Sequence, residues 1–528
     1  MNEKSITAEQ VQREYERGKD YKNGLNLYES VKICERMVEG DQWAGLKVKQ
    51  LRPITMNFLD PICYYKVAQI VSDDVGQEIE PFLPDEEAER AAKIIEQSID
   101  RVVERQKIKA KHREILRDAF VDGDAALYFW FDPAAKTGMD GVQGDIAAES
   151  IMNTNIIFGN PQNARVQRQP YIIIVQRVPV EEEREKAKKE GVQDWESITG
   201  DSASEYKGED ELSETDKVCT KLTRFWKGKD GFVRFMQVIE KVIVKQETVT
   251  AMTRYPLAYM SWKPRKNSMH GVREIEPLIN TQIAVNKQFT ALGTQVLNNA
   301  MPKLVYNKQK FPDGWDAEAQ TIGVTGDPTQ ALTGVAGSMP IPTDAFGITN
   351  NLLDTAKNVA GANDAALGNI KNPDNTSAIV AVQQATAAPL SLTRLSYYQF
   401  VEDYTRILID MFHAHYGIRH VKTTETVTDP ETGETSEQTV IKEYDFSQLP
   451  VDALDLNINI GAASYWAETL QIATLDNLMN AKVIPDAVEY LERLPDNTVR
   501  NKAGLIEKIE RMQQQAAQAQ MMQQGGVM

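Results

Sequence analysis

Clustered histidines are the first residues to test for chemistry, because histidine binds metals and transfers protons near neutral pH. His413, His415 and His420 lie close together near the end of a predicted helix. A helical zinc pair needs residues i and i+4, whereas His413 and His415 are at i and i+2 and lie on different sides of the helix. We therefore expect polar residues at a helix C-terminus, where the helix dipole favours them, and predict no metal site.

Motifs for nucleotide binding and nucleophilic catalysis are also missing. The sequence has no G-x-x-x-x-G-K-[ST] loop, and the glycine-rich stretch 323–337 lacks the paired Lys-Thr or Lys-Ser of a phosphate loop. Gly337-Ser338-Met339 lacks the second glycine of a nucleophile elbow. Carboxylates are abundant, but no pair stands out. The residues therefore predict no catalytic group, no metal and no cofactor.

Aromatic and basic residues are the remaining candidates for contacts with nucleic acid. Residues 128–131 carry four consecutive aromatic side chains without interleaved cations, which favours core packing over base stacking. The nearest basic cluster is Lys263-Pro264-Arg265-Lys266, with a few lysines bracketing a predicted strand further along the chain. A few exposed cations are commonplace and indicate a solvated surface.

The chain is long and acidic. Its 528 residues are enough for about three or four compact units of roughly 150 residues. Lys and Arg number 59 and Asp and Glu number 76, so 59 − 76 gives a net charge of −17. This surplus of acid argues against a broad cationic face that grips nucleic acid.

Cysteine spacing and hydropathy indicate in which cellular compartment the chain is expected. Cys34, Cys63 and Cys219 lie far apart, which argues against a disulfide framework and fits a reducing compartment. The apolar stretches are much shorter than the roughly 18 residues that span a bilayer, and the first residues lack the apolar core of a signal peptide. We expect no membrane or export step.

Hydrophobic periodicity predicts an α+β first half. The expected helices lie at 25–38, at 57–72 and, as one helix or two, at 85–120. The expected strands lie at 126–131, 155–158 and 171–178, followed by a hairpin of 220–226 with 232–244. The charged stretch 181–217 is expected to form a solvated helix and a mobile loop.

The second half is predicted to be mostly helical. One helix follows His270-Gly271 and extends to about Asn298, and a second starts at Thr343 or Asp344. A strand is expected at 303–306, and a surface hairpin at 423–428 and 437–444. The helical signal at 377–416 contains Pro389, which predicts a kink there.

This order of elements resembles the portal, or head-to-tail connector, proteins of tailed bacteriophages. Short segments are similar to that family as well: Glu39-Gly-Asp-Gln-Trp43, Asp122-Gly-Asp124, Gly159-Asn-Pro161 with Pro170-Tyr-Ile-Ile-Ile174, and His270-Gly271 with Gln282 and Asn286. The likeness covers most of the chain and lies in the order of these motifs.

The resemblance implies an α+β, predominantly helical portal fold with a wing, stem, clip and crown that assembles as a ring. The implied regions are 1–267 as the wing, with 421–446 returning to it; 268–299 as stem helix 1; 300–342 as the clip; 343–361 as stem helix 2; 362–376 as the tunnel loop; 377–417 as the long kinked helix; 418–462 as the wing return; and 463–528 as the crown and C-terminal tail.

The resemblance also implies a function without enzymatic activity. A ring of about twelve copies would form a channel at one capsid vertex for packaging, retention and ejection of double-stranded DNA. Its implied partners are the large terminase subunit, a head-tail adaptor, and the major capsid and scaffolding proteins. The implied location is the virion, after assembly in the cytoplasm of a host bacterium.

Two sets of site residues follow from the resemblance. The tunnel loop would face DNA with Asn363, Asp364, Asn369, Lys371, Asn372 and Asn375. The clip would dock partners with Lys303, Lys308, Lys310 and Trp315.

Two other classes of protein remain open from the residues. One is an internal scaffold, or another structural capsid protein, without a DNA channel. The other is a metal-dependent nuclease that uses some of the many carboxylates.

Overall fold

The computed structural model is of the mixed α+β class, with about 52% helix and 24% strand, which confirms the predicted class. It divides into two compact units, Met1–Ile70 with Glu78–Asn457, and Val71–Gln77 with Ile458–Met528. The structure describes residues 6–43, 53–71, 75–81, 86–137, 142–201, 218–300, 304–309, 312, 321–327, 343–361, 390–428, 435–449, 454–460, 475, 478–479, 487–494, 505 and 508–509.

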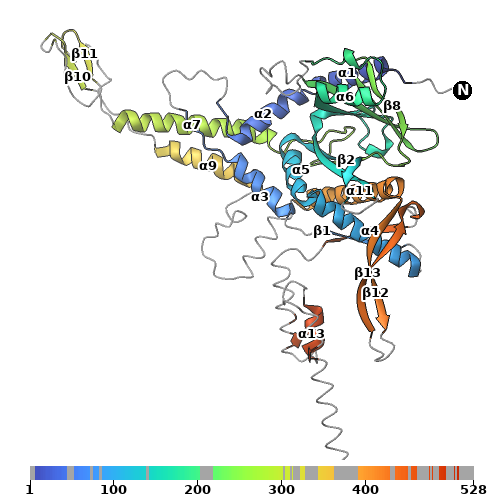
Figure 1. The fold of residues 1–528 in the computed structure, drawn as a ribbon. Helices are drawn as coiled ribbons and strands as arrows, with labels where there is room; N and C mark the ends of the chain where they lie inside the picture. The colour runs from blue at the N-terminus through green and yellow to red at the C-terminus, as the bar shows by residue number, and fades with distance from the viewer. Residues whose placement is uncertain are drawn as a thin grey trace, which may run out of the picture. The chain divides into compact units, whose positions relative to one another are not determined.

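A five-stranded antiparallel sheet belongs to the first unit (Figure 1). Its strands, in spatial order, are β4 (Ile156–Phe158), β5 (Ile172–Pro179), β6 (Val218–Lys227), β7 (Val233–Ile239) and β8 (Val242–Val249). Neighbouring residues of a strand face opposite sides, so each face has its own helix. Val238 packs with Val11 of α1 (Ala8–Gly24), whereas Ile239 packs with Ala187 of α6 (Val180–Lys189).

A three-stranded antiparallel sheet lies in the same unit. Its order is β3 (Gln143–Met152), β2 (Asp124–Lys136) and β9 (Leu257–Ser261). Phe129 of β2 contacts Tyr404 of helix α11 (Ser391–His415), with ring centroids 6.1 Å apart. Tyr128 points the other way and contacts Phe225 of the larger sheet at 6.0 Å. This confirms that β2 is buried on both faces.

Helices α2 (Leu27–Glu39), α3 (Leu59–Val71), α4 (Glu86–Arg105) and α5 (Ile108–Asp122) complete the first half of the chain. The stretch predicted as one helix or two is two, because Lys107 has a left-handed backbone (φ 51°) between α4 and α5. Gly123 ends α5 at φ 97°, a conformation that glycine adopts without steric cost. The predicted break at Asp122-Gly123-Asp124 is therefore confirmed.

The second half contains the two predicted helices, α7 (Glu276–Ala300) and α9 (Thr343–Val359). Strands β10 (Leu304–Asn307) and β11 (Thr321–Val324) pair in parallel between them. The predicted surface hairpin is β12 (Ile418–Thr428) with β13 (Thr435–Asp445), and Thr423 pairs with Val440.

The remaining described elements are short. Strands β1 (Val75–Pro81) and β14 (Leu454–Ile460) pair with each other. In the second unit, α13 (Ala487–Arg493) packs Leu491 against Leu475 and Leu494. Among the described helices, none is both long enough and apolar enough to cross a bilayer.

Two predictions for the first half were wrong. Residues 232–244 form no single strand, because the chain reverses at Glu240 (φ 50°) and gives β7 and β8. Helix α6 is not simply a solvated helix. Its Val180 and Ala187 are buried, and Glu183 is 1% exposed and forms an ion pair with Lys221 at 3.1 Å. The loop part of that insertion, 202–217, lies outside the described residues.

The three cysteines are free thiols, as their spacing predicted. Cys34, Cys63 and Cys219 are all buried, and burial raises the pKa to about 12 for Cys34 and Cys63 and to about 11 for Cys219. The expected kink at Pro389 lies outside the described residues.

Candidate functional site

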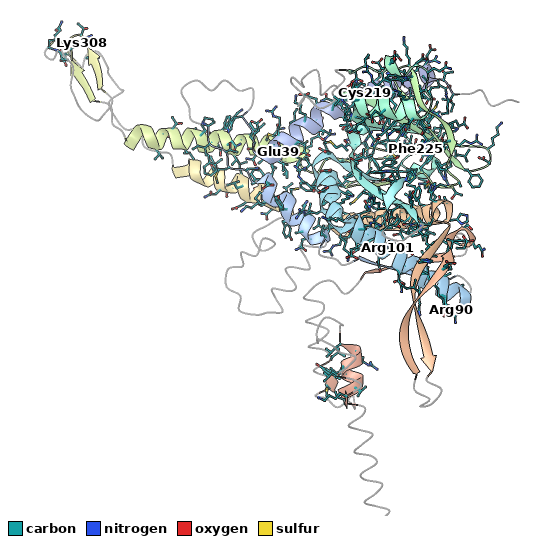
Figure 2. The ribbon with its side chains drawn as sticks, viewed as in Figure 1. Glu39, Arg90, Arg101, Cys219, Phe225 and Lys308 are labelled. Carbon is teal, nitrogen blue, oxygen red and sulfur yellow. The ribbon has the colours of Figure 1, made fainter. Side chains whose placement is uncertain are left out.

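Helices α7 and α9 form a pair that runs antiparallel, since β10 and β11 connect their far ends (Figure 1). Thr349 of α9 donates from Oγ1 to Oε1 of Gln288 in α7 at 2.7 Å. Thr349 and Ala356 are buried on the side of α9 that faces α7. Figure 2 shows Lys308 beyond the end of α7 that is joined to β10. We call α7 and α9 the helix pair.

The helix pair carries few charges and leaves apolar side chains uncovered. Glu276 and Lys287 are the only charged residues of α7. Ile348 and Val359 of α9 are eleven residues apart, which is about three helical turns and therefore the same side of the helix. Their exposed fractions are 53% and 73%, and that of Val296 on α7 is 45%. These are apolar side chains that another protein could cover.

A ladder of buried polar side chains anchors α7. Gln282, Asn286 and Thr290 are spaced by four residues on one face, and their exposed fractions are 3% or less. They accept hydrogen bonds of 3.0 Å each from alternate backbone N–H groups, those of Phe58, Met56 and Ile54 respectively. We call these contacts the polar ladder.

The spacing of the polar ladder follows from elementary geometry. Four residues of α-helix rise about 6 Å, and two residues of extended chain rise about 6.6 Å. A helix with hydrogen-bonding side chains at i, i+4 and i+8 can therefore satisfy every second amide of an extended segment. Gln282 also donates from Nε2 to the carbonyl of Met56 at 2.7 Å, as a neighbouring β-strand would.

The polar ladder continues into the end of α2. Asn286 donates from Nδ2 to Oε1 of Gln42, and Gln42 donates to the carbonyl of Met37 at 2.7 Å. Asn57 donates to the carbonyl of Val38 at 2.7 Å. Two carbonyls near the C-terminus of α2 are thus satisfied by side chains. Gln42, Gln282 and Asn286 were separate motif residues in the sequence, and the structure brings them together.

Ion pairs fix the start of α7. Glu274 accepts hydrogen bonds from Lys66 at 2.7 Å and lies 2.5 Å from the ammonium of Lys263. Nearby, the guanidinium of Arg117 binds both carboxylate oxygens of Glu35 at 2.9 and 2.6 Å. These contacts tie α7 to α3, and α5 to α2.

A buried Asp–His pair lies where β2 and β9 meet the segment before α7. His270 Nδ1 is 2.7 Å from Oδ2 of Asp124, which also accepts from the hydroxyl of Tyr259. Oδ1 of Asp124 accepts from Asn153 at 2.6 Å. A carboxylate only accepts, so Nδ1 carries the proton and Nε2 is left free for another partner. Among the described residues, no nucleophile is hydrogen-bonded to Nε2, so the pair alone defines no catalytic site.

Two titratable groups on α5 have pKa values shifted from their ordinary values. Burial lowers the pKa of His112 to about 4, and Tyr397 bonds its Nδ1 at 2.8 Å. Burial, with the nearby carboxylate of Glu35, raises the pKa of Asp118 to about 6. Both lie on α5; His112 is buried, whereas the side chain of Asp118 is partly exposed.

Most of the predicted site residues lie outside the described part of the chain. This applies to the whole DNA-facing set, Asn363, Asp364, Asn369, Lys371, Asn372 and Asn375, and to Lys303, Lys310 and Trp315 of the docking set. Lys308 is described and exposed, directly after β10, and its N–H donates to the carbonyl of Val324 at 2.8 Å. The structure therefore describes only one of those ten positions, and the roles predicted for all ten stay predictions.

Sequence reasoning missed the contacts of the polar ladder. The available signal was the spacing of Gln282, Asn286 and Thr290 at i, i+4 and i+8 on a helix poor in charge. What could not be foreseen was the partner, because residues 54–58 are more than 220 positions away.

Within the described residues, no group of three or more His, Cys, Asp or Glu side chains is arranged to hold a metal ion. A scan against protein-family models gives no match, and a search of curated proteins finds no similar sequence.

Proposed function

We propose that this chain is the subunit of a portal-type ring that conducts double-stranded DNA through one vertex of a phage capsid. The observation that carries the proposal is the helix pair, which is antiparallel, poor in charge and exposes apolar side chains on both helices. The helix pair follows the α+β region, carries the β10–β11 strands between its two helices, and precedes the long helix α11. This order of elements is the one that resembles the portal family.

The exposed apolar side chains of the helix pair support a ring. Covering the exposed part of a side chain such as Ile348, Val359 or Val296 stabilises by about 1–2 kcal/mol, a gain that a single chain leaves unused. Identical subunits that pack head to tail around an axis cover such a surface in every copy, and a closed ring leaves no copy unpaired.

The polar ladder supports a role for α7 as a firmly anchored element of the ring. Three side chains of α7 hold the backbone of 54–58, and the same network caps α2. The helix pair is thereby fixed at its base by buried hydrogen bonds, which are costly to break.

Charge supports passage of DNA. Twelve copies at −17 each carry roughly −200 charges, so a channel made of them repels the phosphate backbone and does not retain it. In this proposal the tunnel loop 362–376 touches the backbone weakly through Asn363, Asn369, Lys371, Asn372 and Asn375, with Asp364. The clip 300–342, with Lys303, Lys308, Lys310 and Trp315, docks the large terminase subunit and later the head-tail adaptor.

Imaging of the purified chain with matched variants tests the proposal. We expect the wild type to form rings with a central hole in negative-stain electron microscopy. Val359→Asp places a charge on the uncovered face of α9 and should abolish or strongly reduce the rings. Val249→Asp is the control, because Val249 is 51% exposed on β8, away from the helix pair.

Two results would overturn the proposal. One is a wild-type chain that stays a monomer or dimer under all assembly conditions. The other is a Val359→Asp variant that forms rings as well as Val249→Asp does. Mass photometry on the same samples gives the subunit number independently of the images.

A further inference from the structure

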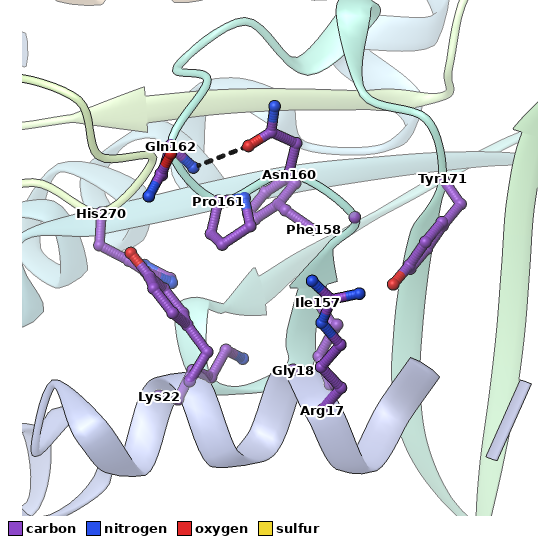
Figure 3. Close-up of a pocket in the computed structure, with 12 residues that line it drawn as sticks. Arg17, Gly18, Lys22, Ile157, Phe158, Asn160, Pro161, Gln162, Tyr171 and His270 are labelled. Atoms are coloured by element: carbon purple, nitrogen blue, oxygen red, sulfur yellow. Dashed lines mark hydrogen bonds between the residues drawn. The ribbon is translucent and has the colours of Figure 1, made fainter. Parts of the chain in front are cut away.

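A cavity of about 490 Å³ opens between α1 and the loop after β4 (Figure 3). Twelve described residues line it: Arg17, Gly18, Tyr21, Lys22, Ile157, Phe158, Gly159, Asn160, Pro161, Gln162, Tyr171 and His270. Its volume lies within the range of sites for small organic molecules, roughly 300–1,000 Å³.

The charge of this lining is opposite to that of the protein. None of the twelve residues is acidic, although the chain carries 76 Asp and Glu residues, while Arg17 and Lys22 are basic. Lys22 is 2% exposed and donates to the carbonyls of Asn153 and Thr154 at 2.9 and 2.5 Å. In Figure 3, the guanidinium of Arg17 points from α1 into the space in front of Tyr171. The cavity is therefore electrostatically suited to an anion.

His270 adds a buried and directed polar atom. It is 3% exposed, its Nδ1 is held by Asp124, and its Nε2 has no hydrogen-bond partner among the described residues. Because the ring also lines the cavity, Nε2 is the nitrogen available to a ligand. The bond to Asp124 fixes the orientation and tautomer of the ring, as in buried histidines that act on ligands.

Two glycines keep the walls of the cavity close together. A Cβ at Gly18 would lie 2.2 Å from Cγ2 of Ile157, and one at Gly159 would lie 2.8 Å from Cδ1 of Tyr171. Both separations are too short for any side chain. The close approach brings Arg17 on α1 towards Tyr171 on the opposite wall.

We propose that this cavity binds the phosphate group of a small phosphomonoester. The anionic oxygens would accept from the guanidinium of Arg17 and the hydroxyl of Tyr171. A phosphate that retains a hydroxyl can also donate to the lone pair of His270 Nε2, whereas sulfate has no proton to give. The remaining volume accepts the organic part of the ligand, which can contact Tyr21 in the lining of the cavity.

Calorimetric titration of the full-length chain with three probes tests this assignment. We expect saturable binding of adenosine 5′-monophosphate, weaker binding of inorganic phosphate, and sulfate binding at least about tenfold weaker than that of phosphate, since a hydrogen bond is lost. Arg17→Gln should weaken phosphate binding by about tenfold or more. Tyr171→Phe should weaken it by about two- to tenfold.

Arg13→Gln is the matched control, one turn earlier on the same exposed face of α1 and outside the cavity. Circular dichroism of each variant confirms that it is folded. The proposal is overturned if neither phosphate nor the nucleotide binds saturably, if sulfate binds as tightly as phosphate, or if Arg17→Gln and Arg13→Gln bind equally. Since the readout is ligand binding, the result does not depend on ring formation.

Discussion

Asn286 accepts a hydrogen bond from the backbone N–H of Met56 at 3.0 Å, across 230 positions of sequence. The same side chain donates to Gln42, so one asparagine joins three separate segments of the chain. Because it is 1% exposed, water cannot replace either bond without opening the packing around α7.

Asn286→Ala should therefore destabilise the fold by about 1–3 kcal/mol, because it leaves buried polar groups without partners. The free energy of unfolding from urea titration measures this loss. Lys287→Ala, at the exposed neighbouring position on α7, should change it by less than about 0.5 kcal/mol. Equal effects of the two substitutions would show that the polar ladder does not stabilise the fold.

Gly18→Ala should destabilise by about 1–3 kcal/mol, because the new Cβ overlaps Ile157, a branched side chain with little freedom to move. Gly24→Ala, at the end of the same helix with nothing within 4 Å, should be neutral or stabilise by up to about 1 kcal/mol. Thermal unfolding of both variants separates the clash from the change in helix propensity. A more stable Gly18→Ala protein would contradict the close contact of α1 with β4.

The lowered pKa of His112 predicts that the protein loses stability in acid. Its pKa is about 4 in the folded protein against an ordinary value of 6.5, so the unfolded chain binds more protons between these values and stability falls as the pH drops through this window. The shift corresponds to a loss on the order of 3 kcal/mol. His112→Asn keeps an acceptor for Tyr397, and its unfolding free energy should depend less on pH. His420→Asn, at an exposed position, should retain the wild-type dependence.

Asp118 changes the pH dependence of stability in the opposite direction to His112. Its pKa is raised from 3.8 to about 6, so the folded protein binds more protons in this window and the contribution of Asp118 falls as the pH rises from 3.8 to 6. Relative to wild type, Asp118→Asn should therefore gain stability as the pH increases through that range. Urea titrations across the window measure the difference. A gain of the same size in Asp20→Asn, which is exposed on α1, would argue against burial as the cause.

Deletion of residues 363–375 tests the channel function proposed for the chain. A portal-type subunit should still form rings but fail to package DNA, because the segment proposed to contact the duplex is gone. An internal scaffold would be indifferent to the deletion. Electron microscopy of the rings and DNA content of the particles are the two measurements, and normal packaging would count against the tunnel-loop assignment.

Long apolar periodicities were predictable from the sequence, as α3, α7 and α9 show. Helix α1 was missed because its apolar residues Val11 and Tyr15 are few and its surface is strongly charged. The split of 232–244 into β7 and β8 was missed because Glu240 reverses the chain without glycine or proline. Strand β3 was not predicted, since its identity depends on pairing with β2.

The candidate site was predictable only as a set of residue types. Gln42, Gln282 and Asn286 were noted as motif residues, but polar side chains on a helix usually face solvent, and nothing local shows that an extended segment covers them. The cavity next to His270 depends likewise on contacts between α1, β4 and β9, whose residues lie far apart in sequence.

The three buried thiols have a practical consequence for fluorescent labelling. Maleimide dyes react with thiolate, which Cys34, Cys63 and Cys219 scarcely form near neutral pH. Lys308→Cys, at an exposed position, would therefore react with the dye without removal of the three native cysteines. Fluorescence from that single position can then test whether another protein binds at Lys308.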